Sequence, residues 1–83
     1  MSSREIVINV PEEIIEAEHT DEAGFARELS LLAAIKLYEL GRLSSGGAAE
    51  LAGLSRIEFL AALSRYHVFP LEDELHDLEQ DRA

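Results

Sequence analysis

Several common features are missing from this chain of 83 residues, and each absence excludes a class of protein. Cysteine is absent, so the chain has neither a disulfide framework nor a thiolate metal site. No apolar run approaches the roughly 20 residues that a membrane-spanning helix needs, and the N-terminus lacks the basic and apolar regions of a secretory signal. We therefore expect one small cytoplasmic domain, residues 1–83, without a membrane segment.

Basic residues are also scarce, because seven lysines and arginines stand against 17 acidic residues, for a net charge of −10. Such a balance opposes binding to nucleic acid, where phosphate contacts need positive charge. Residues 1–41 and 71–83 hold most of the acidic residues. The middle region, residues 42–70, is the only non-acidic one, with a net charge of +1 from Arg42, Arg56, Arg65, Glu50 and Glu58. Three arginines would hold DNA weakly, so useful affinity would require two copies or a basic partner.

Small and apolar residues in residues 45–64 fall at the positions that a helix-turn-helix requires. Ala49, the fifth residue of this stretch, lies where two helices approach closely. Gly53, the ninth, lies in the turn, where a left-handed backbone is common and favours glycine. The positions that face inward hold Ala48, Ala52, Leu54, Phe59 and Ala62. The spacing predicts a helix-turn-helix within residues 42–69, and it is also compatible with a generic helical hairpin.

Polar residues at the ends of both expected helices support this interpretation. Ser44 or Ser45 is suited to cap the first helix. Ser55 is suited to cap the second, and Glu58 follows it at the spacing of a capping box. We expect the second helix to cover about residues 56–66.

The N-terminal ten residues have the pattern of a β-strand. Ile6, Ile8 and Val10 alternate with other residues in a β-branched run that Pro11 ends. The rest of the sequence contains no second strand, and a lone strand leaves its backbone groups unpaired. We expect this strand to pair with its counterpart in a homodimer or with a partner's sheet; the alternative is an extended arm over the chain's own helices. The expected fold class is therefore mainly α, a helix-turn-helix domain with one N-terminal β-strand paired across a dimer.

Residues 11–41 are expected to form two helices. Pro11 at a first helical position and the acidic residues after it favour a short helix. A polar break follows at residues 19–24. A longer helix, rich in leucine, should then begin at Asp21 or Phe25 and continue to about residue 40, with Gly41 as its C-cap glycine.

The C-terminal segment, residues 70–83, is acidic and carries three spaced leucines. The predicted partner-binding residues are Leu71, Leu75, Leu78, Glu72, Asp73 and Glu74. The segment is either a short helix docked by its leucines or a tail that folds on a partner, and its acidic side chains suit a basic, partly apolar groove. An ordinary solubilising tail is the alternative.

The sequence resembles a known group of proteins in the run YELGRLSSGGAAELAGLSRIEFLAAL, which follows a segment ending in PEE and a leucine-rich helix. It looks like a member of a short uncharacterised prokaryotic family of antitoxin-like helix-turn-helix proteins from toxin-antitoxin modules. The resemblance covers about residues 6–78. It implies a homodimer that binds operator DNA near its own gene and neutralises a companion toxin, a basic protein such as a ribonuclease, by occupying its phosphate-binding groove.

The sequence departs from the family pattern at SSGG, residues 44–47. The family pattern has a large apolar residue at the position of Ser45 and a lysine at that of Gly47, so a phosphate contact is lost here. Gly46 and Gly47 weaken a helix by roughly 0.5–1 kcal/mol each relative to alanine. They also expose backbone N–H groups at a helix N-terminus, which can themselves hold a phosphate.

The predicted DNA-binding residues lie at helix ends of the middle region: Arg42, Ser45, Ser55, Arg56, Ile57 and Arg65. Arg56 begins the second helix, whose N-terminal end would enter the major groove, and a guanidinium can bridge two acceptors of a guanine or phosphate. Ile57 would either touch a thymine methyl or pack internally. Arg42 and Arg65 would contact the DNA backbone or remain solvated.

Nothing in the sequence indicates an enzyme, a cofactor or a metal site. The histidines at positions 19, 67 and 76 have no spacing that suggests a catalytic pair or a ligand set. Two functions remain open. The chain is either a DNA-binding antitoxin that represses its own operon, or a protein-interaction module whose helix-turn-helix no longer binds DNA.

Overall fold

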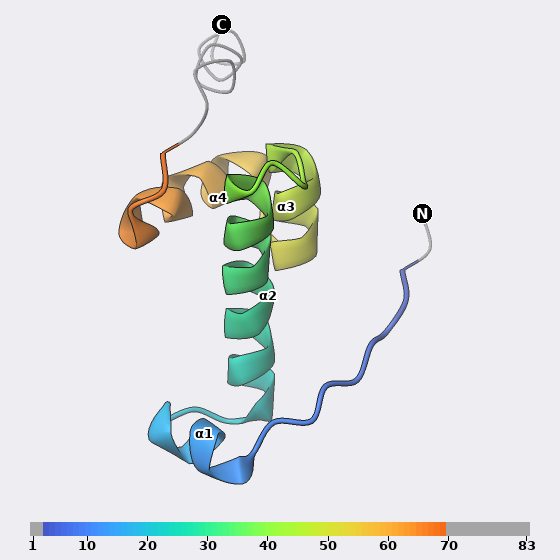
Figure 1. Ribbon diagram of the computed structural model, residues 1–83, viewed down its shortest axis with the longest axis vertical. Coiled ribbons are helices and arrows are strands. Elements are labelled where there is room, and N and C mark those ends of the chain that lie inside the picture. Colours follow the sequence, from blue (N-terminus) through green and yellow to red (C-terminus); the bar gives the residue numbers. More distant parts are fainter. Residues whose placement is uncertain (1–2, 70–83) are drawn as a thin grey trace, which may run out of the picture.

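The computed structural model describes residues 3–69. Its elements are α1 (Glu12–Ala17), α2 (Glu22–Glu39), α3 (Ser45–Ala52), α4 (Arg56–Leu63) and the 3-10 helix η1 (Ser64–Tyr66). The long helix α2 carries α3 and α4 at its C-terminal end, and α1 lies near its N-terminal end (Figure 1). The predicted mainly helical fold is confirmed.

The ends of α2 are set by the residues that the sequence indicated. Asp21 caps its N-terminus, and the carboxylate accepts a hydrogen bond of 2.8 Å from the backbone N–H of Gly24. At the other end Gly41 has a φ of +76°, the left-handed conformation of a C-cap glycine. This helix, like the others within residues 3–69, is not long and apolar enough to cross a membrane.

The N-terminal segment corrects the prediction of a strand. Residues 3–10 form neither helix nor strand, and within residues 3–69 the backbone of this segment makes no hydrogen bond to another backbone group. It leads into α1 as an extended chain and diverges from α2 toward the N-terminus (Figure 1). The physical reason is that a strand needs a neighbour, and the described chain contains no second extended segment to pair with it.

The helix α1 contributes little to packing. Pro11 is its N-cap, one position before the expected one, and Glu12 and Glu13 occupy its first turn. Acidic groups there interact favourably with the helix dipole. None of the residues of α1 is buried.

The core lies where α2, α3 and α4 meet. The residues that form it are buried alanines and larger apolar residues: Ala34, Ile35, Tyr38, Ala48, Ala49, Phe59, Leu60, Leu63 and Val68. Tyr38 of α2 and Phe59 of α4 pack edge to face, with ring centroids 5.7 Å apart. Because alanines occupy the buried face of α3, this helix approaches its neighbours closely. Four of the five positions predicted to face inward contribute to this core, since Ala48 and Phe59 are buried in it and Ala52 and Leu54 are half-buried against it; the fifth, Ala62, is also buried.

Candidate nucleic-acid interface

Local residues set both ends of α3 and the turn that leads from it to α4. Ser44 caps α3, and its hydroxyl accepts a hydrogen bond of 3.1 Å from the N–H of Gly47. Gly53 ends α3 with a φ of +73°. The next N–H, that of Leu54, bonds the carbonyl of Ala49 at 2.9 Å. The left-handed residue reverses the chain so sharply that α4 begins only three residues after Gly53, at Arg56.

The N-terminus of α4 carries the predicted capping box. The N–H of Glu58 donates to the Ser55 hydroxyl at 3.1 Å, and the N–H of Ser55 donates to the Glu58 carboxylate at 2.9 Å. The bond from the Ser55 backbone, and then the Ser55 side chain, lower the pKa of the Glu58 carboxyl below its ordinary value. Glu58 therefore places a negative charge beside the N-terminus of α4.

Arg56 is held in place by a residue of the other helix. Its Nε donates a hydrogen bond of 2.9 Å to the hydroxyl oxygen of Ser45, the first residue of α3. Ser45 is 2% exposed, whereas Arg56 is half-buried. The pair joins the N-termini of the two helices and restricts the orientation of the guanidinium. In this arrangement the Ser45 side chain orients Arg56 and has almost no surface of its own for a ligand.

The remaining predicted contact residues lie at the surface. Ile57 is 63% exposed, which excludes the alternative that it packs internally in the single chain. Arg65 is exposed, with its guanidinium carbon 5.8 Å from the centroid of the Tyr66 ring, and Arg42 is exposed in the loop after α2. The structure thus brings Ser45 and Arg56 together, and within residues 3–69 no hydrogen bond or ion pair joins Arg42 or Arg65 to them.

The two glycines at the start of α3 are not required by the fold. Neither has a positive φ. A Cβ on Gly46 would have no heavy atom nearer than 4.0 Å, and one on Gly47 would meet Ser44 at 3.5 Å, an ordinary van der Waals contact. The methyl group of an alanine would fit at both positions, so the glycines keep the first turn of α3 open to an approaching molecule.

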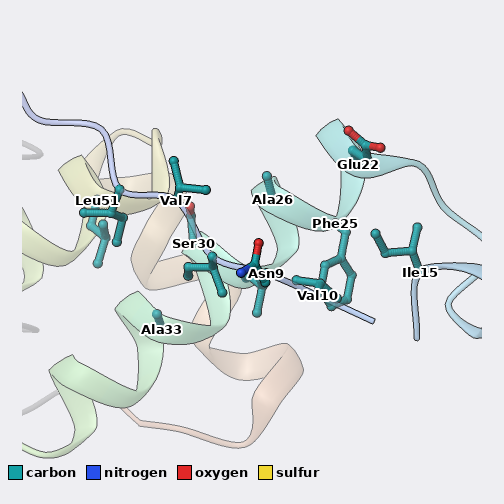
Figure 2. A pocket seen from close by; sticks show the side chains of 13 residues that line it. Val7, Asn9, Val10, Ile15, Glu22, Phe25, Ala26, Ser30, Ala33 and Leu51 are labelled. Carbon is teal, nitrogen blue, oxygen red and sulfur yellow. The ribbon is translucent and has the colours of Figure 1, made fainter. Parts of the chain in front are cut away.

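A second feature, which the sequence did not indicate, is a groove between the N-terminal segment and α2. Its volume is about 560 Å³. One face of α2 forms its floor, through residues spaced three or four apart such as Phe25, Leu29 and Ala33, and Leu51 of α3 closes one end (Figure 2). Residues 6–10 form the opposite wall. The sequence indicates that apolar side chains surround most of α2. It does not locate the groove, because the part of this surface that stays uncovered depends on how the other elements pack against the helix.

The remaining sequence predictions concern the C-terminal segment and metal binding. The predicted partner-binding residues, Leu71, Leu75, Leu78, Glu72, Asp73 and Glu74, lie outside the described residues. No group of three or more histidine, aspartate or glutamate side chains that could hold a metal ion occurs within residues 3–69.

Comparison with known proteins identifies the family. The model of an uncharacterised protein family, UPF0175, matches residues 1–83. The chain belongs to this family. A UPF0175 protein of Aeropyrum pernix is 36% identical over 81 residues, which are 98% of this chain and 85% of the relative. A UPF0175 protein of Archaeoglobus fulgidus is 50% identical over 54 residues, 65% of this chain and 61% of the relative.

The match to the Archaeoglobus protein thus spans less than two thirds of that relative. No solved structure matches the chain. The family name UPF0175 states no activity.

Proposed function

We propose that this UPF0175 protein is a homodimeric DNA-binding antitoxin that represses its own operon, with α3 and α4 as a helix-turn-helix. The observation that carries the proposal is the fixed position of Arg56 at the N-terminus of α4. In a helix-turn-helix the second helix enters the major groove, where its first residues contact base edges. A guanidinium that is already oriented loses less freedom when it bonds a guanine or a phosphate.

The local surroundings of Arg56 support this role. Ile57 follows it as an exposed apolar side chain that suits a thymine methyl group. The N-terminus of α3 offers the backbone N–H of Gly46 to a phosphate, whereas that of Gly47 already donates to the Ser44 hydroxyl, and this end of the helix compensates in part for the missing lysine. Arg42 and Arg65 add positive charge in the region that has a net charge of +1.

The antitoxin role would use the acidic C-terminal segment. Residues 71–83 carry six acidic residues and one basic residue, together with three leucines. Such a segment is suited to the basic, partly apolar groove of a ribonuclease. Deletion of residues 71–83 should abolish binding to the companion toxin and leave DNA binding intact, as measured by calorimetry and by DNA titration. Full neutralisation of the toxin by the truncated chain would reject this role.

The test of the DNA-binding role compares two arginines. Arg56→Ala should weaken binding to DNA from upstream of the chain's own gene by about 10- to 100-fold, because one bidentate contact contributes roughly 1–3 kcal/mol. Arg27→Ala removes the same charge from α2, away from α3 and α4, and should change affinity little. Circular dichroism checks that both variants remain folded. Equal losses for the two variants would show that only overall charge matters and would sink the assignment of Arg56.

A second function is favoured by the charge of the whole chain. A net charge of −10 opposes DNA, and Leu51 and Ile57 are exposed on α3 and α4. In that case the protein would be an interaction module in which the α3–α4 unit is a scaffold. Absence of DNA binding at low salt, together with capture of a basic partner by the intact chain, would decide for this alternative.

A further inference from the structure

The N-terminal segment is the most exposed apolar part of the described chain. Ile6, Val7 and Ile8 are 83%, 92% and 62% exposed. Apolar clusters of this kind on a monomer usually mark an interaction surface. The segment also carries unpaired backbone groups, since within residues 3–69 its N–H and C=O groups bond no other backbone group. Both features indicate a missing partner for residues 4–10.

The groove beside this segment has the length of such a partner. The α2 residues of the floor extend from position 22 to 33, which corresponds to roughly 17 Å of helix. Five extended residues, the number in residues 6–10, also span roughly 17 Å. An extended segment of this length would therefore cover the groove from Phe25 of α2 to Leu51 of α3 (Figure 2).

We propose that the groove receives the N-terminal segment of a second copy of this chain. Residues 4–10 of the two copies pair antiparallel about a twofold axis at Val7, and the ribbon lies against the α2 helices of both. This register pairs all seven residues, places Ile6 opposite Ile8 of the other copy, and brings no like charges opposite each other. It rests on the proposed function in one respect, because it supplies the dimer that two DNA-reading units require.

The charges around the groove favour a second copy over a basic partner. Glu22 is the single charged residue among those that line it. A basic protein would gain little there, whereas residues 6–10 carry no charge and match an apolar wall. A stable interface buries about 800 Å² on each partner, and a short ribbon alone would bury less than that. A stable dimer therefore requires both the pairing of the two N-terminal segments and the contact of the ribbon with the α2 helices.

The experiment is sedimentation equilibrium of the intact purified chain without DNA. The wild type should be a dimer at micromolar concentration. Ile8→Asp should raise the dimer dissociation constant at least 100-fold, because it buries a charge in the ribbon. Ile57→Asp is the matched control, since Ile57 is 63% exposed on α4 against 62% for Ile8, and it should remain dimeric. A monomeric wild type, or a dimer that only Ile57→Asp disrupts, overturns the proposal.

A second measurement remains decisive if Ile8→Asp proves unfolded by circular dichroism. The chain has no cysteine, so Val7→Cys introduces a single thiol. Residues directly opposite on antiparallel strands are close enough for a disulfide, so mild oxidation should link most of the protein into covalent dimers. Ile57→Cys should link far less. Equal cross-linking of the two variants overturns the register. Because neither measurement involves DNA, a failure of the dimer and a failure of DNA binding are distinguishable.

Discussion

At the C-terminal end of α2, the core side chains of α3 and α4, such as Ala49, Phe59 and Leu63, are buried within a single chain, whereas at its N-terminal end residues 6–8 are exposed. The first region contains its own caps, its own turn and an aromatic pair between Tyr38 and Phe59. The second contains a lone extended segment and a helix, α1, with no buried residue. The difference shows that one end of the molecule has a packed core in the single chain and the other does not; we propose that association completes the second.

The largest expected effect is a loss of stability when the core between α2, α3 and α4 is disrupted. Phe59 is fully buried, so Phe59→Ala leaves a cavity and should lower the free energy of unfolding by roughly 3–5 kcal/mol, measured by urea denaturation at fixed protein concentration. Ile57→Ala, two positions earlier on the same helix, should cost less than about 1 kcal/mol because Ile57 is exposed. Similar losses for the two variants would place the core elsewhere.

Substitution of glycine by alanine gives the next largest change in stability, and the sign of this change differs between two positions. Gly53→Ala should destabilise the protein by roughly 1–2 kcal/mol, because alanine is strained at a φ of +73°. Gly46→Ala should instead stabilise it by roughly 0.5–1 kcal/mol, since Gly46 is helical and unobstructed. Thermal denaturation of both variants checks the prediction. A loss of stability in Gly46→Ala would mean that the glycine is needed for the fold after all.

Much of the region with the packed core was predictable from the sequence. The caps at Ser44 and Ser55 and the left-handed conformations of Gly41 and Gly53 depend on neighbours within a few residues, so local patterns locate them. The second helix was predicted as one piece. In the structure α4 ends at Leu63 and continues as the 3-10 turn η1, where the Ser64 hydroxyl donates to the carbonyl of Ala61.

The features that were not predictable depend on residues far apart in the chain. The burial of Ser45 and its bond to Arg56 follow from the way α4 packs against α3 over 11 residues of separation, which no local pattern specifies. The N-terminal residues have the composition of a strand, but strand formation requires a neighbouring segment. Likewise, the groove exists only because that segment and α2 lie apart.

The smallest predicted effect is a dependence of stability on pH. The pKa of Glu58 is lower in the folded chain than in the unfolded one, so its contribution is present above the unfolded pKa and is lost as the pH falls through the folded value. Between roughly pH 5 and pH 3 the wild type should therefore lose more stability than Glu58→Gln. Glu50→Gln on α3 is the control for the change in charge. Identical pH profiles for wild type and Glu58→Gln would contradict the capping box in solution.

We propose that α3 and α4 bind DNA although the chain as a whole is acidic. The most direct measurement is a titration of the wild-type protein against DNA from immediately upstream of its gene, at several salt concentrations. We expect sequence-specific binding in which the logarithm of the affinity falls with the logarithm of salt concentration with a slope of roughly −3 to −5, because a few arginines from each of two copies contact phosphates. No binding even at low salt, or binding without salt dependence, would contradict it.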